Sequence, residues 1–360
     1  MLFALIASTA LSGGLSEHGA APERVAADLI AETGSPGAAA MRSCPDTYDA
    51  GVAGVRVAGA DAPIRADDLW HMGSNTKAMT ATLAARLVEQ GVISWDARIA
   101  DTLADLDLKI AEALGEATLE DLLAHRAGLT PNAGLFTALR LRGADADRDL
   151  HADRLVYARA VLGEAGGPRG AYQYSNAGYV IAAMMMEQAS GASYEAMMAR
   201  EVFEPLGMDQ AGWGPPGEPG ALDQPRGHGS GLFGGLDAEE PGPGADNPPA
   251  MNPAGRVHVA LDDLAAFLNA HRDHAEPYLS AESWARLQTP VAGGDYALGW
   301  GVRADGSLVH AGSNTMWFAR MLIDQQTGCA YAVAVNDGRI DTVSAPVNTA
   351  LERLAGRGAP

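Results

Sequence analysis

The sequence predicts an α/β fold: an antiparallel β-sheet flanked by helices and built from both chain ends, with a mostly helical region inserted between them. Three observations predict it. Strand-like apolar runs separated by turns occur near the start and in the last third, helical patterns fill the middle, and a helical pattern closes the chain. We expect residues 21–360 to form one domain, its α/β part from about 21–75 and 255–360 and its helical part from about 76–254.

The first elements are a helix, two strands and a second helix. Residues 22–32 have helical spacing and end at Gly34, and residues 37–43 and 50–59 are typical of strands. A second helix begins near Ser74 and stops at Gly91, a residue type that favours the position after a helix.

The middle of the chain is dominated by helical patterns. Helices are expected over residues 175–189 and 193–203, the second one stopping before Pro205. Met184 to Met186 are interpreted as core residues. Residues 214–250 are rich in Gly and Pro and predict a long irregular loop, either a lid or a surface excursion.

The C-terminal third predicts a helix, an antiparallel meander and a closing helix. The first helix covers residues 261–271, and the closing helix covers about 342–354. Between them, short apolar runs alternate with turns at 296–303, 307–312, 317–324 and 329–335.

The acidic balance of the chain excludes some classes of partner. Asp and Glu number 45 against 25 Lys and Arg, which gives a formal net charge of −20 and argues against nucleic acid or an anionic membrane surface. A small-molecule or peptide substrate is expected instead, and the oligomeric state stays open. No segment is long and apolar enough to predict an integral membrane helix.

Residues 1–20 form a candidate signal peptide. The apolar run from Met1 to Gly14 resembles the hydrophobic region of such peptides, although no Lys or Arg precedes it. We expect export to the periplasm, with a plain N-terminal extension and a cytoplasmic protein as the alternative. We interpret the two cysteines, Cys44 and Cys329, as buried free thiols rather than a disulfide or a zinc site.

Ser74 and Lys77 form a Ser-x-x-Lys pair at the expected start of a helix. At this spacing both side chains lie on one helix face. A serine hydroxyl needs a base nearby, and lysine serves as one only when its pKa is lowered, whereas arginine stays protonated. The chain has only two lysines, Lys77 and Lys109. A capping serine followed by an exposed lysine is the structural alternative.

Two further short motifs bear on the same chemistry. Tyr174-Ser175-Asn176 offers a tyrosine that acts as a general base when its pKa is lowered, and an amide that can hold a substrate carbonyl. His310-Ala311-Gly312 ends a strand with small residues, beside which a substrate backbone can lie. A helix cap beside a packed tyrosine and a plain strand end are the alternatives.

With these motifs the sequence resembles the serine β-lactamase and penicillin-binding-protein superfamily, from about Ser35 to Val335. The closest branch resembles class C β-lactamases, D-Ala-D-Ala carboxypeptidases and β-lactamase-like esterases. The resemblance rests on segments in the family's order: GSNTK, LLAHRAGL, YSN, FEPLGM, NPAGRVHVALDDLAAF, GWGV and HAG.

The resemblance implies two-step acyl transfer through a covalent acyl-enzyme, with no metal or cofactor. Ser74 would be the nucleophile, Lys77 its proton-relay partner and Tyr174 the general base that also protonates the leaving group. Asn176 would contact the acyl side chain. The remaining expected site residues are His310 and Gly312 of the third motif, and Ser313, whose backbone N–H would form the oxyanion hole with that of Ser74.

The third motif departs from the family pattern, which usually begins with lysine. His310 is mostly neutral at pH 7, so binding of a substrate carboxylate there is in doubt. We therefore expect a short-chain ester or D-amino-acid peptide in preference to a β-lactam. His125 is expected to order a loop near the site, His228 to be a plain loop residue, and His258 has no assigned role.

Three alternatives remain beside this serine hydrolase. The first is a β-lactamase or D,D-carboxypeptidase, and the second is a catalytically silent binding protein on the same fold. The third is an unrelated Ser-His-Asp or metal-dependent hydrolase, but the sequence contains neither G-x-S-x-G nor H-E-x-x-H.

Overall fold

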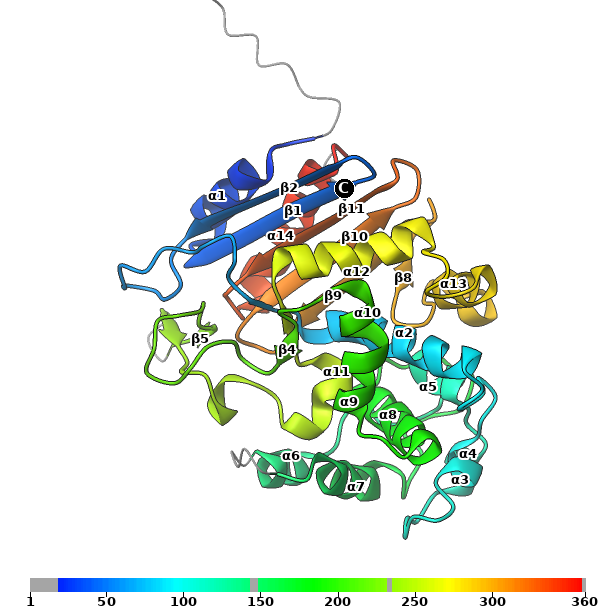
Figure 1. Cartoon of the computed structure of the whole chain (residues 1–360). Helices are drawn as coiled ribbons and strands as arrows, with labels where there is room; N and C mark the ends of the chain where they lie inside the picture. Colours follow the sequence, from blue (N-terminus) through cyan, green and yellow to red (C-terminus); the bar gives the residue numbers. More distant parts are fainter. Residues whose placement is uncertain (1–18, 143–147, 232–234, 358–360) are drawn as a thin grey trace, which may run out of the picture.

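The computed structural model describes residues 19–142, 148–231 and 235–357 (Figure 1). Its main sheet has six antiparallel strands in the order β2-β1-β11-β10-β9-β8. The strands are β1 (Gly37–Cys44), β2 (Thr47–Gly54), β8 (Gly301–Val302), β9 (Leu308–Ser313), β10 (Phe318–Asp324) and β11 (Cys329–Val335). Because β1 pairs with β11, the two ends of the chain form one continuous sheet, as predicted.

Helices cover both faces of this sheet. On one face α1 (Pro22–Thr33) and α14 (Ile340–Leu354) pack against each other and against the strands, and α12 (Leu261–Asp273) lies on the other (Figure 1). The alternation of strand side chains explains this arrangement. Phe318 and Leu322 of β10 belong to the core under α1 and α14, whereas Met321 and Ile323 belong to the core on the opposite face.

The second part of the molecule is helical and is centred on α8 (Asn176–Ser190). This helix contacts α2 (Thr76–Glu89) and three further helices, and Met184 to Met186 are fully buried in it. A helix that is apolar all round is expected to be buried in this way. The other helices are α3 (Ile99–Thr102), α4 (Glu112–Gly115), α5 (Leu119–Leu123), α6 (Leu135–Leu141), α7 (Leu150–Val161), α9 (Tyr194–Met198), α10 (Glu204–Leu206), α11 (Asn252–Gly255) and α13 (Ala281–Gln288).

A small sheet joins the two parts and holds the ends of the long loop. Its strands, β3 (Trp70–His71), β7 (Val257–Val259) and β4 (Gly212–Trp213), pair in that order. Residues 214–250 are mostly irregular, as predicted, but they also contain the hairpin of β5 (His228–Ser230) and β6 (Leu236–Ala238). Because β4 and β7 pair, the loop leaves and returns at one place, directly beside β3 and the Ser74 turn.

Two element boundaries differ from the prediction. The second strand spans 47–54 instead of 50–59, because Gly54 adopts a φ of 85° and turns the chain out of the sheet. The helix expected to stop before Pro205 instead continues through the π-helical residues 199–203 into α10. Pro205 cannot donate to the Glu201 carbonyl, and the Tyr278 hydroxyl donates to that oxygen instead, at 2.8 Å.

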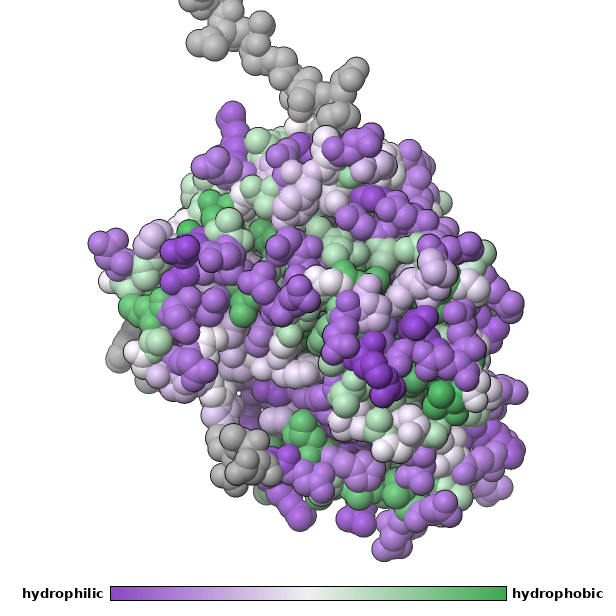
Figure 2. All heavy atoms as spheres, viewed as in Figure 1, coloured by the Kyte–Doolittle hydropathy of each residue, from purple (hydrophilic) through white to green (hydrophobic). Residues whose placement is uncertain are grey.

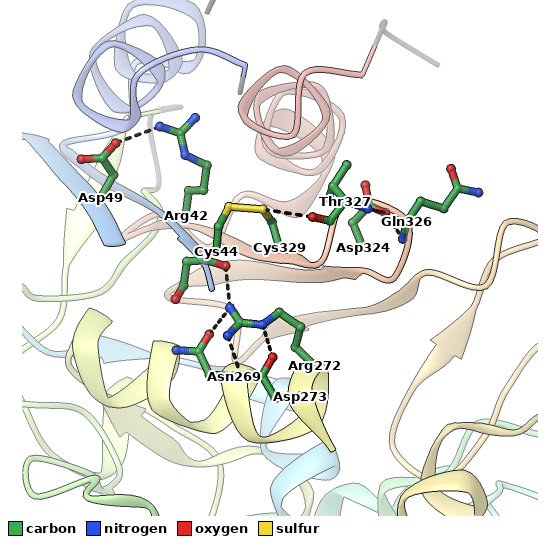
Figure 3. The surroundings of a disulfide bond; sticks show 11 residues. Arg42, Cys44, Asp49, Asn269, Arg272, Asp273, Asp324, Gln326, Thr327 and Cys329 are labelled. Atoms are coloured by element: carbon green, nitrogen blue, oxygen red, sulfur yellow. Dashed lines mark hydrogen bonds and ion pairs between the residues drawn. A yellow bond between two sulfur atoms is a disulfide. The ribbon is translucent and has the colours of Figure 1, made fainter. Parts of the chain in front are cut away.

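The prediction of free thiols is wrong, because a disulfide joins Cys44 to Cys329 (Figure 3). Cys44 ends β1 and Cys329 begins β11, and the register of the two paired strands sets them opposite each other. They are 285 residues apart in the sequence, so the pairing follows from the sheet order and not from local spacing. Nearby, Arg272 of α12 donates to the Ser43 carbonyl at 3.0 Å.

Two expectations concern membranes and targeting. Within the described residues, none of the helices combines the length and the apolar character needed to cross a bilayer. Residues 1–18 of the candidate signal peptide lie outside the described residues.

Candidate active site

Ser74 lies in a tight turn between β3 and α2, and this turn packs against the end of β9. The turn is a short 3-10 helix, η1 (Gly73–Asn75), in which Gly73 has a φ of 50°. A Cβ on Gly73 would lie 2.4 Å from the Ser313 nitrogen, and a Cβ on Gly312 would lie 2.6 Å from the Ser74 nitrogen. Both glycines are therefore needed for the close approach that brings the Ser74 and Ser313 backbone nitrogens into one site.

Lys77, in the first turn of α2, is completely buried next to Ser74. Its Nζ donates to three oxygens: Ser74 Oγ at 3.0 Å, Asn176 Oδ1 at 2.7 Å and the Ala254 carbonyl at 2.5 Å. Burial lowers the pKa of Lys77 well below its usual value. The solvated-lysine alternative is therefore wrong.

The three oxygens around Lys77 are not equivalent. The Asn176 amide oxygen and the Ala254 carbonyl only accept hydrogen bonds, whereas the Ser74 hydroxyl can also donate one. A neutral amine has two N–H donors and one lone pair. Two donors directed at the carbonyl-type oxygens leave the lone pair directed at Ser74 Oγ, which is the arrangement a base requires.

Tyr174 lies close to this pair but accepts no hydrogen bond from Lys77. The Lys77 Nζ is 4.9 Å from the centre of the Tyr174 ring, and it donates to the Ala254 carbonyl instead. Burial raises the pKa of Tyr174 to about 12, although a hydrogen bond with Ser74 opposes the shift. The expected lowered pKa is therefore not found, and the phenol stays protonated near neutral pH.

Asn176, the first residue of α8, is positioned by its neighbours. Its Oδ1 accepts from Lys77, and its Nδ2 donates to Asn132 Oδ1 at 2.8 Å. Asn176 also lines a cleft of about 300 Å³ together with Ser313. It therefore orients Lys77 and also faces the space where an acyl group would lie.

His310 lies on β9, on the same face of the strand as Gly312, and is only 7% exposed. Its Nε2 is 3.2 Å from the Tyr296 hydroxyl. Burial, with a smaller contribution from Lys77, lowers the pKa of His310 to about 3, so the ring is neutral as expected. His310 is not among the residues that line the 300 Å³ cleft, so it contributes no fixed positive charge there.

The three other histidines discussed in the sequence analysis have structural contacts. His125 accepts a hydrogen bond from the Ser175 backbone at 3.0 Å, and its ring is 4.3 Å from that of Tyr174, so it orders this loop as predicted. His228 is buried between the Ala58 N–H and the Asn336 carbonyl, which anchors the long loop to the sheet. His258 bonds the Gly214 carbonyl across the small sheet.

A buried polar network behind Ser74 was missed by the sequence analysis. Asp246, from the long loop, bonds His71 Nε2 at 2.8 Å, Asn314 Nδ2 at 2.9 Å and Arg256 Nε at 2.9 Å. His71 in turn accepts from the Gly73 N–H, and Asn314 directly follows Ser313. The Asp246 carboxylate thus connects the Ser74 turn to the end of β9, the two segments that supply the Ser74 and Ser313 backbone nitrogens.

Burial raises the pKa of Asp246, but His71 and Arg256 outweigh it and hold the carboxyl below its usual pKa. The only signal for this residue in the sequence is a single Asp among Gly, Ala, Asn and Pro. No group of three or more His, Cys, Asp or Glu in the described part of the chain is placed to hold a metal ion.

Comparisons with known proteins concern the family and the fold of the chain. The family model described as Beta-lactamase matches residues 23–354. Penicillin-binding protein 4 of Amycolatopsis lactamdurans is 32% identical over 69% of this chain and 65% of its own length. The unguisins hydrolase ungD' of Aspergillus campestris is 26% identical over 76% of this chain and 51% of its own. The chain thus spans only half to two-thirds of these relatives.

A solved structure shows the same fold. The D-amino acid amidase of Ochrobactrum anthropi SV3 superposes with a TM-score of 0.73 at 23% identity, over 93% of this chain and 97% of that one. Because the family model covers nearly the whole chain, the chain belongs to the beta-lactamase family of serine hydrolases.

Proposed function

We propose that this protein hydrolyses an ester or amide through a covalent acyl-enzyme on Ser74, with Lys77 as the base. The observation that supports this most strongly is the buried Lys77 amine, whose lone pair is left for Ser74 Oγ by two carbonyl-type acceptors. Tyr174, with its raised pKa, has the role of a proton donor in this proposal, and not that of the first base.

In the acylation step, Ser74 Oγ attacks the substrate carbonyl while its proton moves to Lys77 Nζ. The Ser74 and Ser313 backbone N–H groups stabilise the oxyanion that forms. The intermediate collapses, and the leaving group departs with a proton from Tyr174. Lys77 then gives its extra proton to Tyr174.

In deacylation, water attacks the acyl carbonyl and gives a proton to the neutral Lys77. Ser74 then leaves as the hydroxyl by taking this proton from Lys77, which is neutral again. The balance of protons requires no metal and no cofactor.

The neutral His310 supports a short-chain ester or a D-amino-acid peptide as substrate, in preference to a β-lactam. A β-lactamase or D,D-carboxypeptidase is the second candidate, favoured by the similarity to penicillin-binding protein 4. Side-by-side kcat/KM values for p-nitrophenyl butyrate, a D-Ala-D-Ala peptide and nitrocefin separate the two. We expect turnover of the ester and poor turnover of nitrocefin. Nitrocefin hydrolysis faster by orders of magnitude would favour the second candidate.

The nucleophile itself is tested by acylation. Wild-type protein treated with a fluorophosphonate should gain one adduct that peptide mass spectrometry locates on Ser74, and Ser74→Ala should neither be labelled nor hydrolyse the ester. Full labelling of Ser74→Ala would refute the proposal. A folded wild-type protein that no acylating probe labels would favour the silent binding protein.

We also propose that the protein is exported. The Cys44–Cys329 disulfide supports this, because such bonds form and persist in oxidising compartments. Fractionation of expressing cells, with mass spectrometry of the N-terminus, tests it. A reduced protein that keeps residues 1–20 and stays in the cytoplasm would contradict it.

A further inference from the structure

The cleft beside Ser74 has a distinctive lining. Its volume is about 300 Å³, and Asn176 and Ser313 connect it to the proposed catalytic groups. Four asparagines line it, Asn132, Asn176, Asn247 and Asn314, and among the described residues Arg142 is its one charged residue. No Asp or Glu of the described chain lines it, although acidic residues outnumber basic ones in the sequence.

Arg142 is exposed at the end of α6, and its guanidinium has no hydrogen bond or ion pair within the described chain. Other arginines near this part of the molecule are neutralised. Arg154, for example, is buried between Glu187 and Glu195. A guanidinium without a partner among the described residues, at a cleft whose described lining holds no carboxylate, is suited to bind an anion, since its planar donors match a carboxylate.

The helix that holds Arg142 also offers apolar surface. Leu135 and Leu139 precede Arg142 by seven and three positions, so they lie on the same side of α6, as does Ala138 of the cleft lining. Leu135 is 71% exposed and Leu139 is 55% exposed. Figure 2 shows hydrophobic surface over α6. An acyl chain that extended from Ser74 into the cleft could contact Ala138 of the lining as well as the Arg142 guanidinium.

We propose that this cleft binds the acyl part of the substrate and selects acyl groups that end in a carboxylate, recognised by Arg142. The proposal rests on the proposed function, because it names the substrate class of the same site. A free ammonium on the acyl side, as in an amino acid amide, is disfavoured because it would meet Arg142 and no carboxylate. The preferred substrates are therefore half-esters or half-amides of short dicarboxylic acids.

A pair of esters with equal chain length tests this selection. Mono-p-nitrophenyl adipate carries a terminal carboxylate, and p-nitrophenyl hexanoate carries none. We expect wild-type kcat/KM to favour the adipate ester, and Arg142→Ala to lower the adipate-to-hexanoate ratio about tenfold or more, since charged hydrogen bonds of this kind are strong. The change should appear mainly in KM, because Arg142 lies away from the reacting atoms. Arg142→Lys should keep most of the preference.

Arg140→Ala is the matched control, because it removes the same charge from the exposed side of the same helix outside the cleft lining. It should leave both esters unaffected. The inference would be overturned if the wild type showed no preference for the adipate ester, or if Arg142→Ala kept the wild-type preference. In either case hydrolysis would still depend on Ser74. Hydrolysis that persists in Ser74→Ala would instead overturn the proposed function, so the two failures are distinguishable.

Discussion

Lys77 and Lys109 are the only lysines of the chain, and their environments differ completely. Lys77 is buried among Ser74, Asn176 and Ala254, whereas Lys109 is exposed. Lys77→Met should lower kcat/KM for a p-nitrophenyl ester by about a thousandfold, because the loss of a general base has effects of this order. Lys109→Met should leave it unchanged. Activity of Lys77→Met within tenfold of the wild type would contradict the role of Lys77.

Asp246 is predicted to act by positioning. In Asp246→Asn the buried Arg256 loses its counter-charge, and the hydrogen bonds that tie His71 to Asn314 weaken. We expect kcat to fall by about tenfold to a hundredfold with little change in KM, together with a loss of a few kcal/mol of stability. Asp237→Asn, on the exposed part of the same loop, is the control. A lower melting temperature with unchanged kcat would reduce Asp246 to a structural residue.

At this scale the sequence predicted the residues that have strong local patterns. The spacing and rarity of Lys77 predict a buried amine that bonds both Ser74 Oγ and the Tyr174 hydroxyl. The structure shows the burial and the bond to Ser74, but Lys77 bonds Asn176 and the Ala254 carbonyl in place of Tyr174. The roles of Asp246 and of the Ala254 carbonyl could not be predicted. Their partners lie far away in the sequence, and a backbone carbonyl has no sequence signature. The raised pKa of Tyr174 depends on how deeply the loop buries it, which the Tyr-Ser-Asn motif does not reveal.

The contact between β9 and the Ser74 turn is predicted to be intolerant of even one methyl group. A Cβ on Gly312 would lie 2.1 Å from the Met72 carbonyl, so Gly312→Ala must push the strand away from the turn. We expect a loss of about a hundredfold in kcat, as for one impaired oxyanion donor. Gly134→Ala, near the same cleft but with nothing within 4 Å, is the control. Equal activity of the two variants would show that the oxyanion site lies elsewhere.

Most elements follow from local signals. The helices at Pro22, Thr76 and Asn176 end near the glycines that the sequence marks as stops. The failures have tertiary causes. Pro205 is accommodated in a helix because the hydroxyl of Tyr278, from a distant segment, bonds the carbonyl that the proline leaves free. The early start of β2 reflects its pairing with the end of β1.

At the scale of the whole molecule, the disulfide is predicted to stabilise the protein without affecting catalysis. It closes a loop of 285 residues, and its loss should cost about 2–5 kcal/mol of unfolding free energy. The register places Cys44 and Cys329 at the end of the sheet opposite to Ser313. The Cys44→Ala/Cys329→Ala variant should therefore melt at a lower temperature, with unchanged kcat/KM while folded. A large loss of kcat/KM in the folded variant would contradict this separation.

The architecture was predictable because the sequence shows strands at both chain ends, and these can form one sheet only if strands from the two ends pair with each other. A sheet shared by both chain ends brings a strand that ends at Cys44 together with one that begins at Cys329. The sequence does not set the register of these two strands, however, and the register decides whether the two cysteines lie opposite each other. The domain boundaries expected from the sequence, and the signal peptide, stay predictions.

The central claim is that a neutral, buried Lys77 deprotonates Ser74, and the pH dependence of acylation tests it most directly. The rate of Ser74 labelling by an uncharged fluorophosphonate should rise with the neutral fraction of Lys77. Because burial lowers the pKa of Lys77, this rate should level off at a pH well below 10.5, the usual pKa of lysine. Tyr174, with a pKa of about 12, is still protonated at that pH. A rate that keeps rising about tenfold per pH unit through pH 10 would contradict the claim, because it would mean an ordinary lysine or a tyrosine base.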